Sequence, residues 1–140
     1  MSLIDLRNEL EKRLSAIDGL RVYALPPESV TELPAAIIQP GQPLAEYDRT
    51  MAGPRVSYNL AVLLLTGSGD DTEAWKDLAG YVAPVGPLSI KEALETESLE
   101  GKRNGADWLR VVQAEGGGRT LYNKAAYWGV TFLVQGSSGG

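Results

Sequence analysis

Closely spaced carboxylates are the first feature of the sequence that could support chemistry. Glu92, Glu95, Glu97 and Glu100 follow one another within a short stretch. Paired carboxylates can hydrolyse glycosidic bonds or hold a divalent cation. These four, however, fall on a predicted short helix and its exit, and glycosidase clefts are normally built by larger folds. We therefore interpret them as a solvated helix face and predict no catalytic or metal site.

Two glycine-rich runs could be proposed as phosphate cradles. Residues 116–118 are glycines followed by Arg119, but a strand pattern comes next, whereas a phosphate loop leads into a helix N-terminus. Residues 67–70 (Gly-Ser-Gly-Asp) do lie between a predicted strand and a predicted helix. They lack the lysine of a P-loop and the third glycine of a dinucleotide fingerprint. We therefore predict a hairpin turn at the first run and no cofactor at either.

Composition removes most other routes to catalysis. The 140 residues include no cysteine and no histidine, which excludes thiolate nucleophiles, disulfides and the Ser–His–Asp and Cys–His arrangements. The chain is acidic, with a net charge of −5, so nucleic-acid binding by the chain alone is not expected. No apolar run reaches the roughly 20 residues of a membrane span, and the N-terminus lacks a signal-peptide pattern. We predict a protein that is made and folded in a cytoplasm.

The sequence begins with its clearest helix. Over residues 2–17, leucines and an isoleucine recur at steps of three and four and give one apolar stripe. Glu9 and Arg13 are predicted to pair one turn apart on the exposed side of this helix. Asp18 and Gly19 are predicted to end it, because glycine readily adopts the left-handed conformation of a helix C-terminus.

Three strands follow, with a long loop before the third. Residues 20–25 and 34–39 predict short strands, each closed by a proline-containing pair. Residues 40–54 are rich in proline, glycine and polar side chains and predict a loop, which at this length is often functional. Residues 55–65 predict a strong strand with period two. Its last residues are apolar on both faces, which predicts burial on both sides there.

Two helices and a hairpin complete the chain. Residues 70–82 and 88–97 predict helices, the second capped by Ser89. Residues 106–115 and 121–135 predict paired strands. The inner stripe predicted for the first of these helices is Trp75, Leu78, Ala79 and Val82. The face predicted to be buried on the last strand is Ala126, Trp128, Val130, Phe132 and Val134.

The predicted order is therefore α-β-β-β-α-α-β-β. It indicates a single α+β domain over residues 1–135, with a mostly antiparallel sheet and two to three helices packed on one face. Residues 136–140 (Gly-Ser-Ser-Gly-Gly) are expected to form a flexible C-terminal tail.

The order and style of these segments are those of a known family. The stretches 20–27 and 33–40, the long polar loop, the strand from Val56 and the aromatic-rich strand from Ala125 carry the likeness. The chain resembles the tail terminator and tail-completion proteins of long-tailed bacteriophages. The resemblance covers almost the whole chain, and it is one of layout, without a diagnostic motif.

The resemblance implies a structural virion protein. Members of that family form hexameric rings that cap the finished tail tube and offer a docking surface to the DNA-filled head. It implies a homo-oligomeric ring here, with the tail tube protein and the head–tail connector protein as partners. DNA would pass through the lumen without specific binding, and no membrane, metal, cofactor or catalytic residue is implied. The protein would lie in the tail or neck of the virion after synthesis in the bacterial host cytoplasm.

Contacts with neighbours and with the tail tube are expected from the polar loop 40–54 and the hairpin turn 116–122. Basic residues gather near the last hairpin and acidic ones mostly elsewhere, which would suit a head-to-tail ring. The candidate interface residues are Glu46, Tyr47, Asp48, Arg49, Arg103, Arg119, Tyr122 and Lys124.

Two other functions are compatible with the sequence. The chain could be a different head–tail connector, stopper or minor tail protein, since these share its size, acidity and layout. It could also be a small enzyme that uses carboxylates or tyrosine. A concave pocket with converging carboxylates would favour the enzyme.

Overall fold

The computed structural model describes residues 3–23, 27, 30, 32–48, 55–68, 73–95, 108–122 and 125–138. Within them, helices and strands follow the predicted order. Their bounds are α1 (Leu3–Leu14), β1 (Arg21–Tyr23), β2 (Ala35–Asp48), β3 (Arg55–Ser68), α2 (Glu73–Val82), α3 (Ile90–Glu95), β4 (Trp108–Tyr122) and β5 (Ala125–Ser138).

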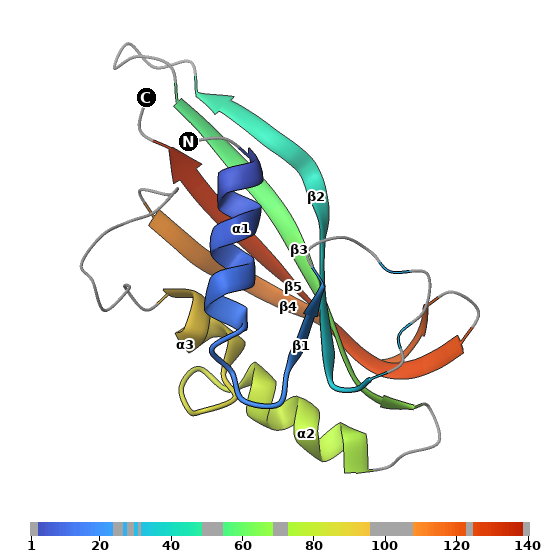
Figure 1. Ribbon diagram of the computed structural model, residues 1–140. Coiled ribbons are helices and arrows are strands. Elements are labelled where there is room, and N and C mark those ends of the chain that lie inside the picture. Colours follow the sequence, from blue (N-terminus) through green and yellow to red (C-terminus); the bar gives the residue numbers. More distant parts are fainter. Residues whose placement is uncertain are drawn as a thin grey trace.

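One twisted sheet with helices on a single face makes up the fold. Its five strands are ordered β1-β2-β3-β5-β4. β1 runs parallel to β2, and all other neighbours run antiparallel. Figure 1 shows α1 lying across the sheet, with α3 and α2 continuing the helical layer toward one end. The predicted class, α+β with a mostly antiparallel sheet and helices on one face, is confirmed.

The loop predicted over residues 40–54 is wrong in its first part, because β2 continues to Asp48. Its register against β3 shifts between Pro40 and Ala45, which is a bulge. β1 pairs only with residues 35–37 of β2. Pro40 and Pro43 come after the segment that β1 pairs with, where one edge of β2 has no partner strand in the described ranges. Proline is tolerated at such an edge because its missing N–H removes no hydrogen bond between strands there.

The turn predicted at residues 116–118 is also wrong, because these glycines lie inside β4 and the chain reverses only after Tyr122. The register of β4 against β5 shifts at two places, one of them at Gly116. Gly116 has a φ of +94°, a left-handed conformation that favours glycine. The run bends a long strand instead of ending it. At the other end β5 reaches Ser138 by pairing with both neighbours, so the predicted tail 136–140 begins too early.

The main core lies between the sheet and the helices. The apolar stripe predicted for α1 is buried there, and so is most of the face predicted for β5. α1, α2 and α3 all contribute fully or nearly buried side chains. The core side chains from these helices and from β5 are Leu6, Leu10, Leu14, Leu78, Tyr81, Ile90, Leu94, Val130, Phe132 and Val134.

A second, smaller core lies on the opposite face of the sheet. The second half of β3 contributes side chains to both cores, as its two-sided apolar pattern predicts. Leu64 belongs to the helix-side core, and Leu63 and Leu65 belong to the smaller one. Three tyrosines, Tyr23, Tyr122 and Tyr127, pack against this second cluster. The sheet is therefore covered on both faces near its middle.

The Glu9–Arg13 pair forms as predicted, with 2.8 Å between the Arg13 Nε and a Glu9 oxygen. Its predicted exposure is wrong, because Glu9 is only 5% exposed. The reason is tertiary: α3 packs beside α1, and the Arg13 guanidinium also donates a hydrogen bond to the Leu94 carbonyl. The Arg13 guanidinium therefore pairs with Glu9 within α1 and links α1 to α3 through its hydrogen bond to Leu94.

The Ser89 cap predicted for the short helix is confirmed. Its Oγ accepts a hydrogen bond from the Glu92 backbone N–H at 3.1 Å and donates to the Ala83 carbonyl at 2.6 Å. Of the helices in the described ranges, none has the length and apolar character needed to cross a membrane.

Candidate interaction surface

Glu46 holds three strands together on the face opposite the helices. Its carboxylate accepts hydrogen bonds at 3.3 Å from the Asn59 side chain of β3 and at 3.3 Å from the Gln135 side chain of β5. Asn59 also donates to the Pro43 carbonyl at 2.8 Å, beside the bulge of β2. Gln135 in turn accepts from Arg110 of β4 at 3.4 Å. This polar row therefore crosses four strands near the end of β2.

Tyr47 lies next to Glu46 but on the helix side of the sheet. It stands opposite Val56 in the ladder, and strand alternation places it on the same face as Tyr58, which packs against the helix-side core. Tyr47 is 78% exposed. A large aromatic ring thus stands uncovered near the end of β2, and Leu44 of the same strand is exposed as well.

Tyr122 lies at the other end of the molecule, at the tip of β4. Its hydroxyl donates a hydrogen bond to the Pro27 carbonyl, and its ring packs against the second core. Burial raises the pKa of the Tyr122 phenol above its ordinary value, and the nearby phenols Tyr127 and Tyr23 act in the same direction. Tyr122 therefore has a structural role, and its contact with a partner stays a prediction.

The remaining candidate residues divide into two groups. Asp48 and Arg119 have described backbones, at the end of β2 and inside β4. Arg49, Arg103 and Lys124 lie outside the described residues. The structure brings Glu46, Tyr47 and Asp48 together at one end of the sheet. It places Arg119 and Tyr122 at the opposite end of the sheet, where β4 ends and β5 begins, apart from Glu46, Tyr47 and Asp48.

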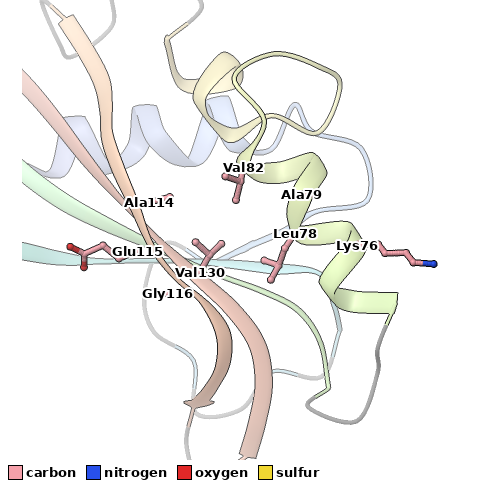
Figure 2. A pocket seen from close by; sticks show the side chains of 8 residues that line it. All are labelled: Lys76, Leu78, Ala79, Val82, Ala114, Glu115, Gly116 and Val130. Atoms are coloured by element: carbon pink, nitrogen blue, oxygen red, sulfur yellow. The ribbon is translucent and has the colours of Figure 1, made fainter.

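A groove that the sequence analysis did not predict opens between α2 and β4. Its volume is about 460 Å³, and its lining residues are Lys76, Leu78, Ala79, Val82, Ala114, Glu115, Gly116 and Val130. Figure 2 shows Leu78 and Val130 pointing toward one another, while the side chains of Lys76 and Glu115 point away from the groove. The interior of the groove is therefore apolar, and its two charged residues lie at the rim.

Small side chains on β4 create this hollow. Ala114 stands opposite Phe132, and Gly116 stands opposite Val130, on the face that the helices cover. α2 lies over β3 and β5 and contacts β4 less, and the described β4 residues on the helix side of this space, Ala114 and Gly116, carry little or no side chain. The groove thus results from two small residues at a place where the helical layer stops short of the sheet edge.

The inner stripe predicted for α2 is partly wrong, and this explains why the groove was missed. Among the described side chains of α2, those of Ala74, Leu78 and Tyr81 are buried, and the side chain of Trp75 lies outside the described ones. Ala79 is exposed and Val82 is 45% exposed. The helix is rotated from the predicted orientation and turns its Ala74 side inward, where Thr66 of β3 donates a hydrogen bond to the Ala74 carbonyl at 2.9 Å. The signal in the sequence that could have indicated the groove is that the apolar residues of α2 cover more of its surface than one buried stripe requires.

Over much of its length, the outer edge of β4 has no strand partner among the described residues. α3 covers its beginning, where the Val111 N–H donates to the Glu95 carboxylate at 3.5 Å. From Val112 to Tyr122, no other strand in the described ranges pairs with this edge. Val112 and Leu121 are exposed, the latter by 75%. The groove and this edge therefore form one continuous surface.

Two of the four carboxylates singled out in the sequence, Glu92 and Glu95, form hydrogen bonds or ion pairs within the fold. Glu92 accepts a hydrogen bond from the Gly86 N–H at 2.6 Å. Glu95 pairs with Lys91 and accepts from Val111. Glu97 and Glu100 lie outside the described residues. Within the ranges that are described, no three acidic side chains lie close enough together to hold a metal ion.

Comparison with models of protein families gives no match for this chain. Comparison with curated protein sequences gives no significant match.

Proposed function

We propose that this protein is a structural virion subunit that associates with copies of itself into a ring of the tail-terminator kind. The ring would cap the tail tube and join it to the head connector of a long-tailed bacteriophage. The observation that carries the proposal is that, among the described strands, the sheet ends on both sides in edges that no further strand pairs with, beside exposed apolar side chains. Tyr47 stands at the β2 side and Leu121 at the β4 side.

Open edges of this kind favour association. An unpaired strand presents a row of backbone N–H and C=O groups, and monomeric proteins normally shield such edges. Two different edges on one molecule favour a head-to-tail contact, which closes into a ring when the rotation between subunits permits it. The order of helices and strands, which carries the family resemblance, supports the same assignment.

Charge supports the proposed passage of DNA. The chain carries a net charge of −5, and a ring of such subunits repels the phosphate backbone. DNA can then slide through a lumen without being retained. Hexameric stoichiometry, the tail tube partner and the connector partner come from the resemblance and belong to this proposal.

Light scattering and negative-stain microscopy of the purified protein test the proposal. A hexamer of the 15.0 kDa chain has a mass of about 90 kDa and a ring-shaped image. Addition of unterminated tail tubes is expected to place a ring on one end of each tube. A protein that stays monomeric at all concentrations and does not bind tail tubes would disprove the proposed function. Binding to connector rings but not to tubes would assign the protein to another part of the neck.

A further inference from the structure

We propose that the groove between α2 and β4 receives β2 of a second copy of this chain. Residues 44–48 of that copy would pair along the open edge of β4, with Tyr47 in the groove. The inference rests on the proposed function, because it names the contact through which neighbouring subunits join.

The groove has the properties of a receiving site. Its volume of about 460 Å³ lies within the range of sites that enclose small ligands, roughly 300–1,000 Å³. Leu78 and Val130 form its buried floor, and Ala79 and Ala114 form exposed walls. When an aromatic ring enters the groove, the apolar surfaces of both the ring and the groove are removed from water. Buried aromatic side chains of this kind contribute most of the binding energy in many protein interfaces.

The open edge of β4 supplies the backbone part of the contact. Because β2, β3, β5 and β4 alternate in direction, a second sheet placed beside the first in the same orientation brings its β2 antiparallel to β4. Antiparallel pairing then extends the ladder across the two molecules. The helices of both copies lie on the same side of the extended sheet.

β2 is the element that fits this edge. Its own open edge begins after residues 35–37, where β1 stops. Pro40 and Pro43 cannot donate to a new ladder, so the segment after them is the part that can pair. In that segment, strand alternation places Ala45 and Tyr47 on the helix side, which is the side on which the groove opens.

Charge complements this arrangement. β2 contains Glu46 and Asp48 and no basic residue, whereas residues 108–138 contain three basic residues and one acidic residue. Lys76 and Glu115 both stand at the rim of the groove, so the complementarity lies in the composition of the β4–β5 hairpin as a whole. An acidic strand beside a basic hairpin favours this register of contact over two copies of the same edge. Each subunit then contacts one neighbour through β2 and the other neighbour through β4. Repetition of this head-to-tail contact can close a ring.

Disulfide trapping tests the contact directly, because the chain contains no cysteine. Ala45→Cys protein mixed with Ala114→Cys or Ala79→Cys protein and a mild oxidant is expected to give disulfide dimers, while each variant alone gives none above background. The double variant Ala45→Cys/Ala114→Cys is expected to give a ladder of covalent oligomers that stops at the ring size. Ala45→Cys mixed with Ala16→Cys, which lies in the exposed turn after α1, is the control and gives no dimers.

A second measurement tests the anchor. Tyr47→Ser is expected to weaken association at least about tenfold, as loss of a buried aromatic anchor does. Ile4→Ser, a matched exposed apolar site on α1 that is 59% exposed, leaves association unchanged. If the protein assembles but neither cysteine pair cross-links, the inference is overturned and the proposed function stands. If the protein neither assembles nor binds tail tubes, both are overturned.

Discussion

Arg13 donates to the Glu9 carboxylate at 2.8 Å inside the protein, where Glu9 is almost wholly buried. The same guanidinium donates to the Leu94 carbonyl at the end of α3. A buried carboxylate is costly unless a charge and hydrogen bonds satisfy it. The pair therefore sets how α1 and α3 pack, and α3 in turn covers the beginning of β4.

Removal of this cation is expected to destabilise the fold strongly. Arg13→Ala leaves the Glu9 charge and the Leu94 carbonyl unsatisfied, so the free energy of unfolding should fall by about 3 kcal/mol or more. Urea denaturation at neutral pH measures it. The control is Lys76→Ala, which removes an exposed pair with Glu73 and should change stability by less than about 1 kcal/mol. Equal effects of the two variants would contradict the role given to Arg13.

The bulge of β2 requires glycine at position 41. A Cβ built on Gly41 lies 2.6 Å from the backbone oxygen of Asn59, which cannot rotate away. Gly41→Ala should therefore lower the free energy of unfolding by about 1–3 kcal/mol, as overpacking does. A Cβ on Gly118 meets nothing within 4 Å, so Gly118→Ala should leave stability unchanged or raise it by up to about 1 kcal/mol. Denaturation midpoints of the two variants check this, and a stable Gly41→Ala protein would refute it.

Tyr81 should make stability fall at high pH. Burial, with a smaller effect of the Asp77 carboxylate, raises the pKa of Tyr81 above 10.0 in the folded protein. Above pH 10 the phenol therefore ionises in the unfolded chain before it ionises in the folded one. The contribution of the Tyr81 phenol to the free energy of unfolding is complete below pH 10 and is lost as the pH rises through the pKa of the phenol in the folded protein.

Tyr81→Phe should accordingly reduce the loss of stability between pH 9 and pH 11, measured by urea denaturation at each pH. Part of the loss should remain, because the pKa of Tyr122 is raised as well. Tyr47→Phe, at an exposed site, is the control and should follow the parent protein. An unchanged alkaline loss in Tyr81→Phe would show that other groups cause it.

Local patterns predicted much of this fold. The apolar spacing of α1, the alternation of β3 and β5 and the hydroxyl before α3 depend on neighbours in the chain, and the structure confirms them. The composition of residues 40–48 and 116–118 suggested loops. Both belong to strands, because an open edge tolerates proline and a bulge accommodates glycine.

The candidate surface was predictable only in part. Glu46 and Tyr47 were chosen from sequence, and the structure places them near the end of β2. The groove could not be predicted from the sequence. It depends on where α2 ends over the sheet and on the pairing of Ala114 with Phe132 in neighbouring strands. Burial of Glu9 likewise depends on α3, which lies some eighty residues further along the chain.

The length of the strands has a consequence for local unfolding. β2 and β4 extend beyond the helical layer, as Figure 1 shows, so one strand passes from a fully buried centre to an exposed end. Amide hydrogens at Ile37 and Val62 should exchange with solvent only when the whole domain opens, whereas those near Tyr47 and Leu121 should exchange through local fraying. The same backbone is thus rigid where it holds the core and adaptable at its exposed ends, where we propose that it meets another subunit.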